Sequence, residues 1–294
     1  MRIVRFAGLV ALLGGLSACG SSRNTEIFSQ QRVLEKTGDA QPLVDQAAEA
    51  WKGREDRAKA EAAVKLWEQA AQMDPTRADI QLSLAYAYYF MCNVHLRWDD
   101  KPDDAMKTTY KKGYEAGRNA VWLAAPEFAE RIKKGEKWES AVKDVDAKAV
   151  PGLYWYATNI GKWALLDGFT TILAEKDHIA ATMGRILELD EGFFHGAPHR
   201  YFGVYRTKIP FPGGDLPASK SHFEKAIGLD GNYLDTKVLF AESYAVKEQD
   251  EDLFKKLLGE VVAAPDDAIP ELIPENKNAK RVAQKLLSDI DEYF

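Results

Sequence analysis

The segment that decides the fold is Ala63-Val64-Lys65-Leu66-Trp67-Glu68-Gln69-Ala70-Ala71-Gln72-Met73-Asp74-Pro75. Ala63, Trp67, Ala70 and Pro75 are spaced 4, 3 and 5 residues apart, as in the second helix of a tetratricopeptide-type repeat. The small residues let two helices approach closely, the indole fills the gap between them, and proline ends the pair. This segment predicts one helical hairpin of a repeat array.

The pattern continues in phase beyond the first hairpin. Leu84-Ala85-Tyr86-Ala87-Tyr88 is typical of the first helix of the next repeat, with Ala in place of Gly, and Phe240-Ala241-Glu242-Ser243-Tyr244 repeats the theme near the C-terminus. No alternating β pattern of useful length is present. We therefore predict an all-α fold: a tetratricopeptide-like helical-hairpin array (α-solenoid) with insertions and a C-terminal capping helix.

The composition is that of a folded, acidic protein. Of the 294 residues 46% are hydrophobic and 29% are charged, which argues against disorder and against a multi-span membrane protein. The formal net charge of −6 repels phosphate groups, so we expect no nucleic-acid partner. Cys92 lies among large apolar residues, and we interpret it as a small buried residue and not as a reactive thiol.

The N-terminus reads as a signal for export. Arg2 and Arg5 precede a short apolar run that ends in Leu16-Ser17-Ala18-Cys19, which resembles a bacterial lipoprotein box. We expect cleavage before Cys19 and acylation (palmitate) of that residue, although an ordinary signal peptide with an incidental Cys is the alternative. The run is shorter than the roughly 20 residues of a membrane span. Gly20, where an inner-membrane lipoprotein has Asp, favours the periplasmic leaflet of the outer membrane.

These signals divide the chain into three parts. Residues 1–18 are the predicted signal peptide, 19–41 a tether, and 42–294 a single helical-repeat domain. Long insertions interrupt the early repeats, mainly at 99–104 and 129–150, and the second is expected to add a helix. We also predict a helix from Phe193 to Ile209 and a final amphipathic helix from Lys280 to Phe294 that covers the open end of the array.

Several motifs in the second half occur in an order that resembles a known family, the T component (TatT) of some tripartite ATP-independent periplasmic (TRAP) transporters. They are Tyr154-Trp155-Tyr156 with Gly161 and Trp163, His199-Arg200-Tyr201-Phe202-Gly203-Val204-Tyr205, Gly213-Gly214-Asp215, and Ala241 to Val246 with Asp250 and Phe254. The resemblance covers roughly residues 60 to 294. It implies a periplasmic lipoprotein, often a homotrimer, that works with the solute-binding P component and has a central opening for ligand. The insertion at 129–150 departs from this picture, and if it lies at a subunit contact it argues against the trimer.

An aromatic row provides the first candidate binding residues. Trp155, Asn159 and Trp163 are four residues apart on one helical face, with Tyr156 beside them. The row is either the wall of a cleft, where Asn159 bonds a ligand or a partner peptide, or part of the core, where Asn159 bonds a neighbouring helix.

His199, Arg200 and Tyr201 form the second candidate group. Arg binds carboxylates through two parallel hydrogen bonds, which suits the organic acids that the family resemblance implies; the alternative is an ion pair with a structural Asp or Glu. His195 and His199 have the i, i+4 spacing of two metal ligands, but Pro198 lies between them and a third ligand is missing, so we predict no metal.

The motifs of common enzymes are absent from the sequence, including H-E-x-x-H, G-x-S-x-G, C-x-x-C and G-x-G-x-x-G. We therefore predict a non-enzymatic transport protein without a cofactor. It would be anchored to the membrane by lipid, dock a solute-binding protein, and bind or pass a small organic or hydrophobic ligand. A helical-repeat scaffold for envelope or outer-membrane protein assembly is the alternative function.

Overall fold

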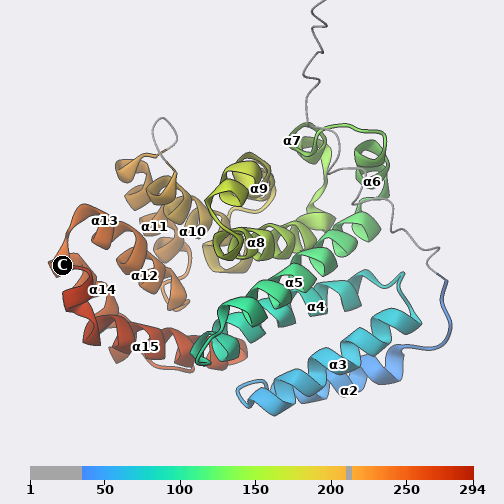
Figure 1. The fold of residues 1–294 in the computed structure, drawn as a ribbon, viewed down its shortest axis with the longest axis horizontal. Helices are drawn as coiled ribbons and strands as arrows, with labels where there is room; N and C mark the ends of the chain where they lie inside the picture. The colour runs from blue at the N-terminus through green and yellow to red at the C-terminus, as the bar shows by residue number, and fades with distance from the viewer. Residues whose placement is uncertain (1–34, 210–213) are drawn as a thin grey trace, which may run out of the picture.

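The computed structural model describes residues 35–209 and 214–294, and within these ranges the chain is helical without a β-strand (Figure 1). The predicted all-α class is confirmed. The predicted signal peptide, Cys19 and most of the predicted tether lie outside the described residues, as does Gly213. No helix in the described ranges is long and apolar enough to cross a membrane.

Most helices pack as consecutive pairs (Figure 1). The pairs are α2 (Gln41–Lys52) with α3 (Arg57–Met73), α4 (Ala78–Phe90) with α5 (Asp103–Ala124), α8 (Val150–Asp167) with α9 (Phe169–Leu189), and α10 (Phe193–Lys208) with α11 (Leu216–Leu229). The chain continues through α12 (Asp235–Phe240), α13 (Val246–Glu248), α14 (Glu251–Ala263) and α15 (Ile273–Ser288). Two π-helical segments extend helices: η1 (Met91–His95) follows α4, and η5 (Ala241–Ala245) follows α12.

Helix α3 contains residues 63–73 of the segment with the tetratricopeptide-type spacing. Ala63, Trp67 and Ala70 are buried, and the Trp67 ring meets that of Trp51 on α2 edge to face at 5.4 Å. The Asp56 carboxylate caps the helix by accepting from the amide of Ala58 at 2.8 Å. The predicted spacing therefore produces the predicted hairpin.

Glycines set the closest approach between helices. A Cβ on Gly117 of α5 would lie 2.6 Å from the Tyr156 amide nitrogen of α8, and one on Gly113 would lie 2.2 Å from Asn159 Oδ1. Only residues without a side chain fit at these two positions, so the backbones of α5 and α8 are in direct contact.

The predicted insertion at 129–150 packs against its own chain. It contains part of α6 (Pro126–Lys133), the four-residue α7 (Trp138–Ala141) and two short 3-10 turns. Trp138 stacks on Tyr156 and His178 at 4.8 and 4.4 Å, and its Nε1 donates to Thr182 Oγ1 at 2.9 Å. The insertion is thus fixed to α8 and α9.

Two predicted helices have other limits in the structure. Helix α15 starts at Ile273, before the predicted Lys280, because Pro274 is tolerated in the first turn; a 3-10 turn (Ile290–Glu292) replaces most of its predicted end. The predicted helix from Phe193 to Ile209 begins with a left-handed turn, in which Phe194, His195 and Gly196 have φ of 42°, 60° and 74°. Regular helix follows only after this turn.

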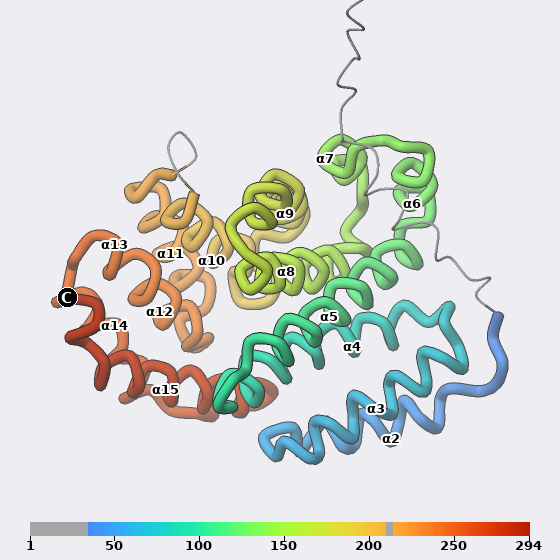
Figure 2. The backbone as a smooth tube through the Cα atoms, in the orientation of Figure 1, coloured from blue at the N-terminus to red at the C-terminus, as the bar shows by residue number. Residues whose placement is uncertain are grey.

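Helix α15 packs on α14 and α12 and also reaches the N-terminal half of the chain (Figure 2). Glu275 pairs with Arg54 in the α2–α3 turn at 3.0 Å and accepts a hydrogen bond from the Tyr86 hydroxyl of α4. Asn278 accepts from Trp98 Nε1 at 3.0 Å. The path of the helices therefore closes on itself.

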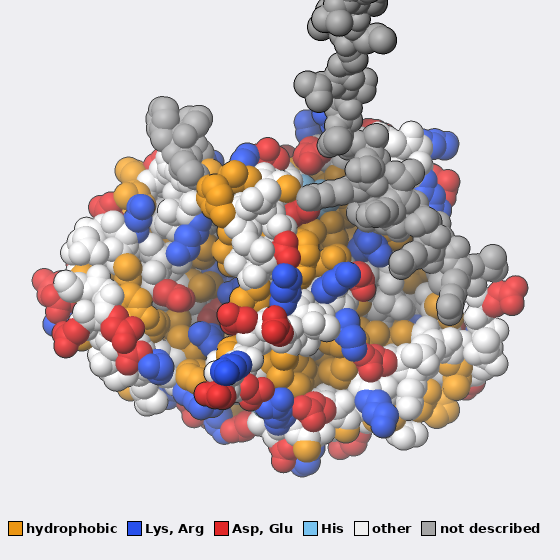
Figure 3. Space-filling view, in the orientation of Figure 1, with side chains coloured by type: hydrophobic (Ala, Val, Ile, Leu, Met, Phe, Trp, Pro, Cys, Tyr) orange, Lys and Arg blue, Asp and Glu red, His pale blue; other side chains and the backbone are white. Residues whose placement is uncertain are grey.

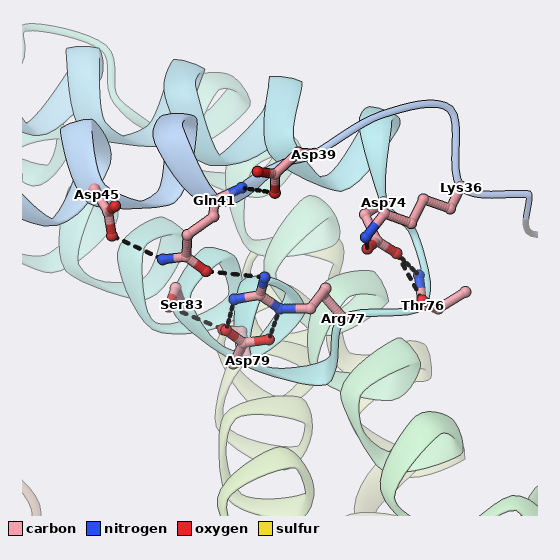
Figure 4. A network of polar contacts seen from close by, with 9 residues as sticks. All are labelled: Lys36, Asp39, Gln41, Asp45, Asp74, Thr76, Arg77, Asp79 and Ser83. Atoms are coloured by element: carbon pink, nitrogen blue, oxygen red, sulfur yellow. Dashed lines mark hydrogen bonds and ion pairs between the residues drawn. The ribbon is translucent and has the colours of Figure 1, made fainter.

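A polar network holds the start of the described chain on the α3–α4 turn (Figure 4). Lys36 Nζ lies 3.2 Å from Asp74 Oδ2, and Arg77 donates to Gln41 Oε1 at 3.2 Å and to Asp79 at 2.7 Å. Lys36 and Gln41, within the stretch predicted as a tether, are thus part of this network.

Candidate functional site

A pocket of about 200 Å³ lies between α8, α9 and α10, and we call it the α9 pocket. Its walls are mainly apolar. They include Gly161 and Leu165 of α8, Ile179 and Met183 of α9, Val204 of α10 and Leu239 of α12. Leu165 is 54% exposed, so this wall of the pocket reaches solvent.

Cationic side chains outnumber acids in the α9 pocket. Lys162, Lys176, Arg200 and Lys208 line it, together with one carboxylate, Asp235. Lys176 pairs with Asp177 at 2.6 Å. In the part of the chain that the structure describes, the ammonium groups of Lys162 and Lys208 form no ion pair. An apolar space with unpaired cations at its wall favours an organic anion.

Arg200 has a structural role as well as a place in the α9 pocket. Its side chain donates to the carbonyls of His195 at 2.8 Å and Phe194 at 3.1 Å, which belong to the left-handed turn. Its guanidinium lies 4.2 Å from the Tyr233 ring centroid. It forms no ion pair with a described Asp or Glu, contrary to the alternative considered from the sequence.

The Arg200 guanidinium is buried, with 4% of the residue exposed. Burial opposes its charge, but the interactions with Tyr233, Tyr154 and Asp235 outweigh this effect and raise the pKa of Arg200. The group therefore remains cationic inside the protein.

The predicted aromatic row lies in the packing between helices. Trp155 stacks on Tyr86 with 4.6 Å between centroids, and Trp163 meets Tyr114 at 5.5 Å. Asn159 is fully buried, and its Nδ2 donates to the Ala85 carbonyl of α4 at 3.0 Å. The row does not line the α9 pocket; Trp155 contributes to a smaller pocket of about 30 Å³.

The other predicted site residues are split between the core and the pocket. Tyr201 lines the α9 pocket beside Arg200. The Tyr156 hydroxyl is hydrogen-bonded to His178 Nε2 at 2.8 Å. His199 is buried, with Nε2 2.7 Å from Glu191 Oε1 and Nδ1 2.8 Å from His222 Nδ1.

The i, i+4 helical geometry considered for His195 and His199 is wrong. His195 lies in the left-handed turn, and its Nδ1 is 2.7 Å from Asp230 Oδ2. Within the described ranges, no group of three or more His, Cys, Asp or Glu side chains is arranged to hold a metal ion.

A second pocket of about 300 Å³ adjoins the first, and we call it the α5 pocket. It lies between α5, α8, α12 and α15, and Lys162, Leu165, Asp235 and Leu239 line both pockets. Figure 3 shows one face of the molecule, on which charged side chains of both signs surround hydrophobic atoms near the centre.

The sequence did not predict Lys162, Lys208 and Asp235 as site residues. Each is of a type common on protein surfaces, and only the packing of the helices brings them to the same pocket.

Comparison with known proteins identifies the chain at the level of family. The family model of the TRAP transporter T-component (TAtT) matches residues 56–294, which include every described helix from α3 to α15. None of the curated proteins compared with the chain matches it.

Proposed function

Since the chain belongs to the TRAP transporter T-component family, we propose that it is a lipid-anchored periplasmic subunit that docks the solute-binding P component and holds solute in the α9 pocket. The anchor in this proposal is Cys19, on the periplasmic leaflet of the outer membrane. The subunit has no catalytic role. Membership of the family supports the transport role, the lipoprotein box supports the anchor, and the lining of the α9 pocket supports solute binding.

The fold suited to this role is one tetratricopeptide-like domain over residues 42–294. The consecutive helix pairs and the small-residue and aromatic spacing of α3 support this interpretation. Assembly as a homotrimer is compatible with the intramolecular packing of Trp138, which keeps its indole buried within one chain. Light scattering of the purified chain tests the trimer.

The solute we propose is an organic anion with a hydrophobic chain. The observation that carries this choice is the combination of apolar walls in the α9 pocket with the ammonium groups of Lys162 and Lys208, which have no ion pair among the described residues. The carboxylate of the solute would lie toward the cations, and its chain would contact Ile179, Met183 and Val204.

Isothermal titration with decanoate tests the binding site. We expect Lys208→Met to weaken binding by about tenfold, because a half-buried anion loses a charge partner. Lys220→Met is the matched control, since Lys220 is an exposed residue of α11 that does not line the pocket. Failure of decanoate and of shorter and longer carboxylates to bind would contradict the proposed solute class.

Crosslinking in the periplasm tests docking. We expect the full-length chain to capture an extracytoplasmic solute-binding protein, and native mass spectrometry to find an organic acid in the complex. Capture of envelope-assembly proteins alone would instead favour the scaffold function. Cys19→Ser tests the anchor, because loss of acylation should move the protein from the membrane fraction to the soluble periplasm.

A further inference from the structure

The two π-helical segments of the described chain meet at one hollow. Asn93 of η1 and Glu242 of η5 both line the α5 pocket, although they are far apart in sequence. A π-helical turn is less stable than an α-helical one and occurs mostly at functional sites, where the additional residue redirects side chains. Because both π-helical turns contribute a residue to the α5 pocket, this pocket is a candidate binding site.

Charged groups of both signs line the α5 pocket. Arg97, Lys162, Asp235 and Glu242 form no ion pair or side-chain hydrogen bond with another residue of the described chain. Nearby charges outside the pocket are paired, such as Lys107 with Asp167 at 2.6 Å. Arg97, Lys162 and Asp235 are partly buried, whereas Glu242 is exposed. A partly buried charge without an ion pair is unfavourable, and a bound molecule of opposite charge would offset this cost.

The balance of charge distinguishes the two pockets. The α5 pocket has two cations, Arg97 and Lys162, and two carboxylates, Asp235 and Glu242. The α9 pocket has an excess of cations. A simple anion would meet both carboxylates in the α5 pocket, whereas a molecule with both charges would match all four groups. The volume of about 300 Å³ is at the lower end of that of small-molecule sites.

We propose that the α5 pocket binds a small zwitterion of the amino-acid or betaine class. Its anionic group lies toward Arg97 and Lys162, and its cationic group lies toward Asp235 and Glu242. The Tyr110 and Met106 side chains supply apolar contacts beside these charges. This site adjoins the α9 pocket of the proposed function and shares Lys162 and Asp235 with it, but Arg97 and Glu242 do not line the α9 pocket.

Thermal-shift screening of the full-length chain in detergent identifies candidate zwitterions, with the protein amino acids and glycine betaine as probes up to about 10 mM. Each amino acid that binds is then compared by titration calorimetry with its N-acetyl derivative, an anion, and with its amide, a cation. We expect both derivatives to bind at least about tenfold more weakly, because each leaves one pair of pocket charges unmatched. Absence of binding by every probe, or equal binding of the derivatives, would overturn the proposal.

Matched variants assign the site. Arg97→Met and Glu242→Gln should weaken zwitterion binding by at least about tenfold, whereas Lys208→Met, which alters only the α9 pocket, should leave it unchanged. Glu242 is exposed, so its variant should fold normally. Decanoate binding to Glu242→Gln separates the two proposals, since it should be unaffected. Loss of zwitterion binding in Lys208→Met but not in Glu242→Gln would show that the α5 pocket is not the site.

Discussion

Arg54 and Glu275 are 221 positions apart, and their side chains form a hydrogen-bonded ion pair with only 10% and 12% of their surfaces exposed. Arg54 lies in the turn between α2 and α3 and Glu275 in the first turn of α15, so this pair joins the two ends of the described fold. The guanidinium also lies over the rings of Trp51 and Phe90, at 5.4 and 5.5 Å.

Loss of one partner should destabilise the protein strongly. Arg54→Met leaves the Glu275 carboxylate buried without its cation, and we expect the free energy of unfolding in urea to fall by about 3 kcal/mol. The double variant Arg54→Met/Glu275→Leu should recover part of that loss, because no unpaired charge remains. Lys277→Met is the control: it breaks an exposed pair with Glu55, and its expected cost is below about 1 kcal/mol. If Arg54→Met and Lys277→Met lowered the free energy of unfolding equally, the buried pair would not be what holds α15 on the α2–α3 turn.

Gly117→Ala should separate α5 from α8. The new methyl group would lie 2.6 Å from the Tyr156 amide nitrogen and 2.8 Å from its Cα, and backbone atoms cannot move aside as a flexible side chain does. We expect a loss of about 2 kcal/mol or more in urea unfolding.

The control for this variant is Gly259→Ala on α14, where a Cβ would meet nothing within 4 Å. This substitution should stabilise the protein by up to about 1 kcal/mol, because alanine has the higher helix propensity. The pair of variants distinguishes the contact at Gly117 from a general effect of glycine in helices.

Local sequence patterns predicted the helices because their signals lie within a few residues. The Ala63–Trp67–Ala70 spacing produced α3, and Asp250 caps α14 by accepting from the Leu253 amide at 2.9 Å. The left-handed turn at Phe194 and His195 was missed, because residues other than glycine, and bulky ones such as Phe above all, rarely adopt positive φ. Arg200 donates to the carbonyls of His195 and Phe194 in that turn, an arrangement that the helical spacing of the sequence does not indicate.

The candidate site was harder to predict than the fold. An aromatic row at helical spacing is compatible with a cleft or with a core. The close packing of the Asn159 side chain on Gly113 and its hydrogen bond to the Ala85 carbonyl place the row in the core. Arg200 and Tyr201 were identified from the family resemblance, and both line the α9 pocket. Asp235 lines both pockets, yet nothing near it in the sequence marks it as a site residue.

Cys92 should be inert in the folded protein. It is fully buried, its thiol contacts the Met106 carbonyl oxygen at 3.6 Å, and burial raises the pKa of the thiol far above its usual range. In a form with Cys19 replaced, we expect dithionitrobenzoate to react with Cys92 only when urea unfolds the chain. Fast labelling in native buffer, at a rate like that of a small free thiol, would contradict the burial of this residue.

Acid should destabilise the protein through His178. This imidazole stacks on Trp138, and burial lowers its pKa to about 4, whereas in the unfolded chain its pKa is about 6.5. Between these values the unfolded chain binds a proton that the folded protein does not, so stability decreases as the pH falls through this window.

We expect this histidine to account for about 2 kcal/mol of the stability lost between about pH 7 and pH 5, measured by urea unfolding at each pH. His178→Gln should be less sensitive to pH over the same interval. His222 has a pKa that is also lowered to about 4, first by burial and then by its neighbours, and it should supply part of the remaining slope. The double variant His178→Gln/His222→Gln should therefore have the flattest pH profile, and an unchanged slope in it would rule out this source of acid sensitivity.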